Sequence, residues 1–193
     1  MKKRGKGKRK AVMLLIIALA AVFVLFGYAK VRSMFWNKSY PYLFKDHINS
    51  AAGEFNVDPA LILAVVKTES SFRPEVVSRA GAKGLMQITP DTFDFICYKG
   101  GFDGYCIDDL FNPEINIRLG TFFLSYLIED FNGELQVALA AYNAGRGSAI
   151  RWLSDSSYSD DGKTLSYIPY KETRNYVEKV TSSFDTYKKL YFK

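Results

Sequence analysis

The sequence predicts a mainly helical domain of the α+β class, preceded by one N-terminal transmembrane helix. A dense basic cluster and a long uncharged stretch occupy only the start of the chain. From about residue 41 onward, apolar residues recur at helical spacing, and three prolines directly follow residues that cap helices. One Gly-containing stretch near residues 80–88 is too short for a helix and predicts a small hairpin or extended segment.

The N-terminal region has the composition of a membrane anchor. Residues 1–10 carry seven Lys/Arg, and residues 11–27 carry no charge. Extended to residue 29, this stretch is long enough to cross a hydrocarbon core of about 30 Å. We therefore expect a cytoplasmic basic tail over residues 1–10, an uncleaved signal anchor over residues 11–29 and a juxtamembrane linker over residues 30–40. A cleaved signal peptide is the alternative, although its apolar region is normally shorter.

The charge distribution argues against nucleic acid as a partner. The 193-residue chain has a formal net charge of +6, but nine of its 26 Lys/Arg lie in residues 1–32, where there is no acid. Residues 33–193 therefore carry 17 basic and 20 acidic side chains, which leaves no basic surplus for a phosphate backbone. The lone histidine, His47, has no evident partner ligands, so we expect neither a metal nor another cofactor.

The helical domain begins at about residue 41. Apolar spacing predicts a first helix over residues 42–55. Asp58, Thr89 and Asn112 each precede a proline, and a capping side chain followed by Pro predicts a helix start. The helix after Asn112 should end near Phe131, because an Asn-Gly pair follows. Its many apolar residues predict a largely buried central helix.

The remaining residues complete one domain over residues 41–193. Further helices are expected over residues 134–143, 148–153 and 170–191, with a Ser/Asp-rich surface loop before the last one. Cys97 and Cys106 flank a Gly-rich stretch. Outside the membrane, a disulfide closing this loop and two free thiols are about equally compatible with the sequence.

Glu69 ends the apolar stretch of the second predicted helix. It shares a helix face with Val65 and Val66, and it falls in the last turn. Apolar burial and the negative end of the helix both disfavour an ionised carboxylate, so we expect a raised pKa. A carboxyl group with a raised pKa can act as a general acid. On local sequence alone, a surface Glu at a helix end is the more common arrangement.

Five motifs, taken in order, change this interpretation: ESSF (69–72), GAKGLMQITP (81–90), NPEINIRLG (112–120), AAYNAG (140–145) and IPYKETRNYV (168–177). In this order and spacing they resemble the soluble lytic transglycosylase (SLT) domain family of the lysozyme-like superfamily. The resemblance covers about residues 41–190. It implies a lysozyme-like fold and an enzyme that cleaves peptidoglycan.

The resemblance also implies roles for individual residues. Glu69 matches the family's only catalytic residue. The matching substrate-binding positions are Ser70, Ser78, Gln87, Tyr142, Asn143 and Glu172. Each of these has a structural alternative: Gln87, for example, could satisfy the hairpin backbone, and Tyr142 could belong to the core. Thr89 departs from the family, because some members carry an apolar residue there.

The reaction implied by the resemblance consumes no water. Glu69 protonates the oxygen of the β-1,4 bond between N-acetylmuramic acid (MurNAc) and N-acetylglucosamine (GlcNAc), and then removes the proton of the MurNAc C6 hydroxyl, which closes a 1,6-anhydro ring. One alternative is a hydrolytic muramidase, which would need a second carboxylate such as Asp91 or Asp94. The other is a non-catalytic, membrane-tethered wall-binding protein.

The expected partners are peptidoglycan glycan strands and, through the N-terminal helix, the lipid bilayer. The expected location is the bacterial cytoplasmic membrane, with the catalytic domain on its extracytoplasmic side.

Overall fold

The computed structural model describes residues 38–192 and, before them, residues 13, 19, 21–28, 30, 31, 34 and 36. It divides into two compact units, Met1–Tyr42 and Leu43–Lys193, each of which is described by itself. The predicted basic tail and part of the predicted anchor lie outside the described residues. Residues 21–28 are helical, with exposed apolar side chains such as Phe23 and Phe26. No helix formed by the described residues is both long enough and apolar enough to cross a bilayer.

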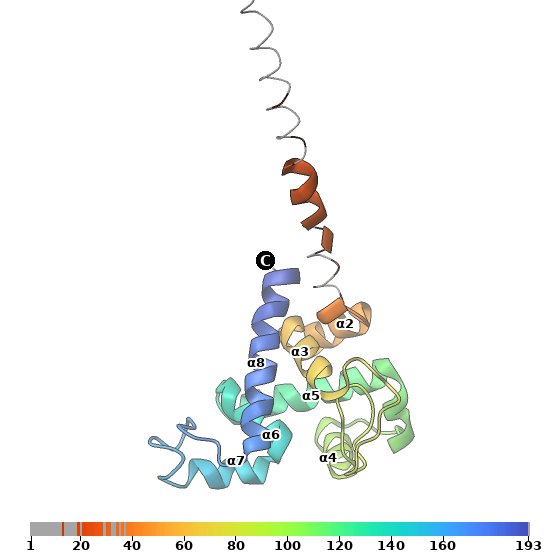
Figure 1. The fold of residues 1–193 in the computed structure, drawn as a ribbon. Helices are drawn as coiled ribbons and strands as arrows, with labels where there is room; N and C mark the ends of the chain where they lie inside the picture. Colours follow the sequence, from red (N-terminus) through yellow and green to blue (C-terminus); the bar gives the residue numbers. More distant parts are fainter. Residues whose placement is uncertain are drawn as a thin grey trace, which may run out of the picture. The chain divides into compact units, whose positions relative to one another are not determined.

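The second unit is mainly helical, as predicted (Figure 1). Its elements are α2 (Lys45–Phe55), α3 (Pro59–Ser70), α4 (Pro90–Gly100), the 3-10 helix η1 (Ile107–Phe111), α5 (Pro113–Asp130), α6 (Leu135–Ala144), α7 (Arg146–Leu153) and α8 (Lys171–Tyr191). The α-helices follow the predicted order, and η1 was not predicted. It lies between Cys106 and α5, after the Gly-rich stretch, and its five residues are too few to show a helical period.

The three predicted helix starts are confirmed. The Asp58 carboxylate accepts a hydrogen bond from the Ala60 N–H at 2.9 Å. The Thr89 hydroxyl accepts from the Thr92 N–H at 3.2 Å, and Asn112 caps α5 in the same way. In each case the capping side chain satisfies a free N–H group, and the proline at the first position has no N–H to lose.

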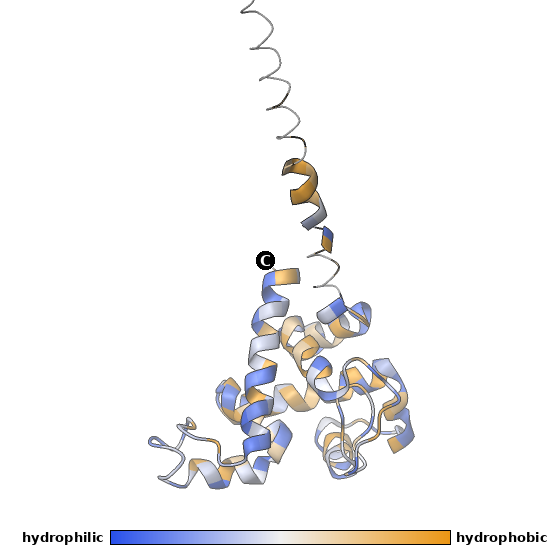
Figure 2. Ribbon diagram, in the orientation of Figure 1, coloured by the Kyte–Doolittle hydropathy of each residue, from blue (hydrophilic) through white to orange (hydrophobic). Residues whose placement is uncertain are grey.

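The core forms around α3 and α5. Helix α3 is buried over most of its length and packs against the long helix α8 (Figures 1 and 2). Helix α8 buries one face, formed by Thr173, Tyr176, Val177, Val180, Ser183 and Tyr187. Helix α5 contacts α2, η1, α4 and α6, which confirms the predicted central helix. The apolar stretches thus converge on one core, as their helical spacing requires.

The segment between α3 and α4, called the extended segment below, consists of turns joined by isolated bridges. Lys83 forms isolated antiparallel bridges with Val77 and with Ile88, in place of a regular hairpin. Gly84 and Gln87 both have positive φ, and the Gln87 N–H bonds to the Gly84 carbonyl, so the chain turns back within four residues. The predicted small hairpin is therefore reduced to single bridges around a four-residue turn.

Both cysteines are free thiols in the structure. Cys97 lies within α4, and Cys106 precedes η1 and is exposed. Of the two alternatives drawn from the sequence, the structure therefore has the free thiols and not the disulfide.

Candidate active site

Glu69 lies at the boundary between the core and the surface. One turn earlier in α3, Val65 and Val66 have none of their surface exposed. The helix ends one residue after Glu69, because Ser71 and Phe72 adopt left-handed backbone conformations with φ of 52° and 62°. The carboxyl group is therefore held on a rigid helix end and packed on its inner side by apolar residues.

Burial raises the pKa of Glu69 from its ordinary value of 4.5 to about 7. This confirms the direction expected from the sequence. Two tyrosines share the environment of this carboxyl: burial first, and then the charge of Glu69, raise the pKa values of Tyr142 in α6 and Tyr176 in α8. The ends of α3 and α6 and the first half of α8 therefore meet at Glu69.

Tyr176 is the residue of this site that the sequence analysis did not single out. Its hydroxyl is buried and has no hydrogen bond of standard geometry among the described residues. Its interaction with the Glu69 carboxyl lowers the pKa of Glu69, against the larger effect of burial. We therefore regard it as a close electrostatic contact that falls short of a full hydrogen bond. The signal was present in the sequence, since Tyr176 follows Glu172 by four residues and shares its helix face.

Tyr142 links helix α6 to the extended segment. Its hydroxyl donates a hydrogen bond of 2.9 Å to the Met86 carbonyl. Its ring packs against Phe123 of α5, with 5.4 Å between the ring centroids. Tyr142 thus belongs partly to the core, as the structural alternative expected. The same contacts fix its hydroxyl close to Glu69, as the functional role requires.

A single buried side chain, Asn116 of α5, holds the extended segment from the other side. Its Oδ1 accepts from the Met86 N–H at 2.7 Å, and its Nδ2 donates to the carbonyls of Lys83 at 3.0 Å and Leu110 at 2.8 Å. A Cβ on Gly84 would lie 2.2 Å from this Nδ2, so only glycine fits there. The sequence analysis gave Asn116 no role, although a lone Asn on a buried helix is a visible signal.

Gln87 and Ser78 lie in the extended segment, and both make bonds to its backbone. The Gln87 Nε2 donates to the carbonyls of Val76 at 3.1 Å and Gly84 at 2.9 Å. The Ser78 hydroxyl accepts from the Ala82 N–H at 3.1 Å. Gln87 thus satisfies the backbone, as the structural alternative expected, while its Oε1 forms no hydrogen bond to a described residue.

The three remaining predicted site residues, Ser70, Asn143 and Glu172, differ in how far they are exposed to solvent. The Ser70 hydroxyl is buried and donates to the Val66 carbonyl of its own helix at 3.2 Å. Asn143 follows Tyr142 near the end of α6 and is partly exposed. Glu172 is exposed in the first turn of α8, one turn before Tyr176. The structure thus brings Glu69, Tyr142, Tyr176 and the extended segment together, whereas the Ser70 hydroxyl points back into α3.

A model of the Transglycosylase SLT domain family matches residues 46–165, which is more than half of the chain and includes Glu69, the extended segment and Tyr142. The chain belongs to this family. The match confirms the resemblance and contains the first four of the five motifs, whereas the fifth motif and α8 lie beyond its end.

Two kinds of curated relative are similar to this SLT domain. The soluble lytic murein transglycosylase of Escherichia coli (strain K12) is 32% identical over 164 residues, which cover 82% of this chain and 25% of the relative. The membrane-bound lytic murein transglycosylase C of Edwardsiella ictaluri is 33% identical over 172 residues, which cover 76% of this chain and 47% of the relative. The chain therefore spans about a quarter to a half of the length of these relatives.

Solved structures show the same fold. The lytic transglycosylase Slt of Pseudomonas aeruginosa, solved as an inactive Glu-to-Gln mutant, is 33% identical, with a TM-score of 0.71 over 80% of this chain and 25% of that one. The 70 kDa soluble lytic transglycosylase in complex with bulgecin A is 28% identical, with a TM-score of 0.73 over 86% of this chain and 28% of that one. The helical SLT fold is thus shared in space as well as in sequence.

Proposed function

We propose that this SLT domain is a peptidoglycan lytic transglycosylase in which Glu69 acts first as an acid and then as a base. The observation that carries the proposal is the environment of Glu69: burial raises its pKa to about 7, and it faces Tyr142 and Tyr176. A pKa near neutrality suits a group that must donate a proton and then accept one. The relatives named lytic murein transglycosylases support the substrate class.

The proposed reaction has two proton transfers at one carboxyl group. Protonated Glu69 donates to the bridging oxygen, and the bond between that oxygen and MurNAc C1 breaks. The N-acetyl group of MurNAc stabilises the cationic centre. The Glu69 carboxylate then removes the proton of the MurNAc C6 hydroxyl, whose oxygen bonds to C1 and closes the 1,6-anhydro ring. Burial of the Glu69 carboxyl at the end of α3 limits the access of water, which would otherwise compete with the C6 hydroxyl.

Two further observations support a single catalytic carboxyl group. The P. aeruginosa relative is inactive as a Glu-to-Gln mutant, so that enzyme depends on one glutamate. In this chain, no second carboxylate is among the groups that shift the pKa of Glu69. Asp91 and Asp94, the candidates for a muramidase, are both exposed on the first half of α4.

We further propose that Ser78, Gln87, Asn143 and Glu172 contact the glycan. The free Oε1 of Gln87 and the partly exposed amide of Asn143 can accept or donate hydrogen bonds to sugar hydroxyl and N-acetyl groups. Ser70 belongs to the same proposed set, and its hydroxyl exchanges its bond to the Val66 carbonyl for one to the glycan.

Product analysis tests the proposal directly. The full-length chain, in detergent, is incubated with purified peptidoglycan, and the released muropeptides are identified by mass spectrometry. We expect 1,6-anhydro ends, and a loss of about 10³-fold in rate for Glu69→Gln. Glu178→Gln, a surface substitution on α8, serves as the matched control and should keep full activity.

The other outcomes identify the alternatives. Reducing MurNAc ends would show a hydrolytic muramidase. Full activity of Glu69→Gln would exclude Glu69 as the catalytic group. A wild-type chain that binds peptidoglycan but releases no product would favour a wall-binding protein.

We also propose that the N-terminal region holds the domain at the cytoplasmic membrane, on its extracytoplasmic side. The basic residues 1–10 followed by the uncharged residues 11–27 support this orientation. The relatives named membrane-bound lytic murein transglycosylase C support a membrane association within the family. Protease digestion of spheroplasts tests it, because the domain should be degraded from outside while the membrane remains intact.

A further inference from the structure

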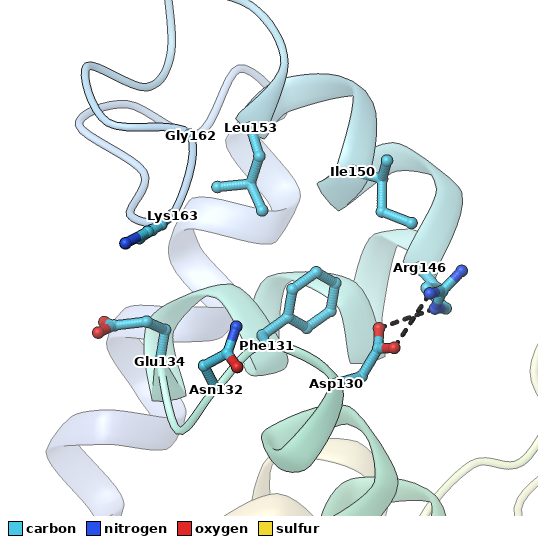
Figure 3. Close-up of a pocket in the computed structure, with 9 residues that line it drawn as sticks. All are labelled: Asp130, Phe131, Asn132, Glu134, Arg146, Ile150, Leu153, Gly162 and Lys163. Carbon is cyan, nitrogen blue, oxygen red and sulfur yellow. Dashed lines mark hydrogen bonds and ion pairs between the residues drawn. The ribbon is translucent and has the colours of Figure 1, made fainter.

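A second pocket, of about 540 Å³, lies where the turn between α5 and α6 faces α7 and the loop that follows α7 (Figure 3). Its volume is in the range typical of small-ligand sites, roughly 300–1,000 Å³. Neither Glu69 nor Tyr142 nor Tyr176 is among the residues that line it. It is therefore distinct from the candidate active site.

One end of the pocket is closed by a rigid ion pair. Arg146 donates from Nε and Nη2 to the two carboxylate oxygens of Asp130, at 2.8 and 3.0 Å. These two bonds satisfy the charges of both groups and hold both side chains in place. A charged ligand group could bind at this end only by breaking the pair, so this end forms a fixed wall.

The other end carries two opposite charges that have no partner. Figure 3 shows Glu134 and Lys163 at the end away from the ion pair. Among the described residues, neither side chain forms an ion pair or a hydrogen bond. Glu134 is also the N-cap residue of α6, yet its side chain does not cap that helix. A ligand that pairs with both charges would therefore displace no existing contact.

The loop that carries Lys163 is held in shape by its own hydrogen bonds. Asp161 Oδ1 accepts from the N–H groups of Lys163 at 2.8 Å and Thr164 at 2.7 Å. The Gly162 N–H donates to the Ser159 hydroxyl at 3.0 Å. The backbone around Lys163 is thus ordered before a ligand binds, which reduces the entropy cost of binding.

An apolar surface fills the space between the two ends. Phe131, which is buried, lies between them, and Leu153 and Ile150 of α7 face it (Figure 3). Ile150 is 38% exposed, which is high for an apolar residue on a helix that packs against the core. A ligand with an apolar side chain would cover this surface and remove it from water.

We propose that this pocket binds a free α-amino acid with a large apolar side chain, such as leucine or phenylalanine. A free amino acid carries an ammonium group and a carboxylate on the same carbon atom, which matches two opposite charges at one end of the pocket. The ammonium group pairs with Glu134, and the carboxylate pairs with Lys163. The side chain then lies on the apolar surface around Phe131.

The arrangement of the pocket selects this class of ligand. A ligand with a net charge would leave either Glu134 or Lys163 without a partner, and an uncharged ligand would gain nothing from either. The reverse orientation is excluded, because Arg146 and Asp130 already satisfy each other. The site does not depend on the reaction proposed for Glu69, since none of its contacts involves that residue.

Calorimetry with defined amino acids tests the site without requiring activity. The full-length chain in detergent is titrated with leucine and with phenylalanine, each as the L and the D enantiomer. We expect saturable binding of at least one of them, with a Kd of about 1 mM or lower. Glycine, which lacks the side chain, should bind at least about tenfold more weakly. Absence of saturable binding for all four, or equal affinity for glycine, would overturn the proposal.

Two variants, each with a matched ligand, test the assignment of the charges. Lys163→Met should weaken leucine binding about fivefold and leave leucinamide, which has no carboxylate, unchanged. Glu134→Gln should weaken leucine binding to a similar degree and leave N-acetyl-leucine, which has no ammonium group, unchanged. Lys189→Met and Glu178→Gln, on the exposed face of α8, are the control variants and should bind all three ligands as wild type does. If each pocket variant weakens its matched ligand as much as leucine, the assigned pairs are wrong and the proposal fails.

Discussion

At the scale of single residues, the site depends on opposed effects at one carboxyl group. Burial favours the neutral form of Glu69, and the contact with Tyr176 favours the charged form. Burial is the larger effect, and the resulting pKa of about 7 lies close to neutral pH. Two proton transfers of opposite direction are then both accessible at the same group.

The raised pKa of Glu69 predicts a dependence of stability on pH. The folded state binds the Glu69 proton more tightly than the unfolded state, so stability falls as the pH rises from about 4.5 to 7. Glu69→Gln removes this effect. We expect the variant to have a free energy of unfolding up to about 3 kcal/mol higher than wild type at pH 8, and no advantage at pH 4. Urea denaturation at both pH values measures it, and an equal difference at the two values would contradict it.

Tyr176 provides a second prediction at this scale. Tyr176→Phe removes the contact that lowers the pKa of Glu69, so that pKa should rise further. Because the first step needs protonated Glu69, the alkaline fall of kcat/KM should move upward by about half a pH unit. Tyr187→Phe, at another buried tyrosine of α8, is the control and should leave the pH profile in place. A downward shift for Tyr176→Phe would rule out the assigned contact.

At the scale of elements, the extended segment between α3 and α4 positions the site. Asn116 holds its backbone from α5, and Tyr142 holds it from α6, so that both bonds end on Met86. Gly120 of α5 permits this approach, because a Cβ there would lie 2.5 Å from the Met86 sulfur. Two helices and one loop are thus joined at a single residue beside Glu69.

Gly84 is the most restrictive position of this element. An alanine there would place its Cβ 2.2 Å from both the Asn116 Nδ2 and the Leu110 carbonyl, at a φ of +75°. We expect Gly84→Ala to lower the free energy of unfolding by about 3 kcal/mol or more and to reduce activity. Gly101→Ala has a similar φ of +67° but open space around it, so it should cost only about 1–2 kcal/mol. Equal losses of stability for the two variants in thermal denaturation would show that the loss at Gly84 comes from backbone strain and not from the clash with Asn116.

The elements also show what could be predicted from the sequence. Helix starts depend on adjacent residues such as Asp58 and Pro59, so they are visible locally and were predicted correctly. Tyr176, on the helix face of Glu172, and Asn116, a lone Asn on a buried helix, are visible in the sequence as candidates. Their partners are far away in the chain, so the sequence does not show what they contact. The glycines of the segment at 80–88 predicted a non-helical piece, and the structure has a turn there, but the bonds that hold it come from α5 and α6.

At the scale of the whole molecule, the SLT domain behaves as a transferable unit. The alignment with the E. coli soluble lytic murein transglycosylase covers 82% of this chain but only 25% of that protein. The same domain therefore occurs in chains that differ in their other segments. In this chain it forms its own compact unit from Leu43 onward. Within the described part of the chain, the buried residues run from Ile48 to Tyr187 and lie in that unit, and a compact unit with its own core is expected to fold by itself.

This independence predicts the result of removing residues 1–40. We expect the truncated chain to keep its thermal midpoint within about 2 °C of the full-length chain in the same detergent, because every residue of the compact unit from Leu43 onward is retained. Its kcat on short soluble glycan fragments should also be unchanged, since Glu69, Tyr142 and Tyr176 all lie in the retained unit. Sedimentation with liposomes, by contrast, should be lost, because the uncharged stretch is removed. A truncated chain that still sediments would place the membrane contact on the domain itself, and a midpoint lowered by more than about 5 °C would show that the N-terminal region is part of its fold.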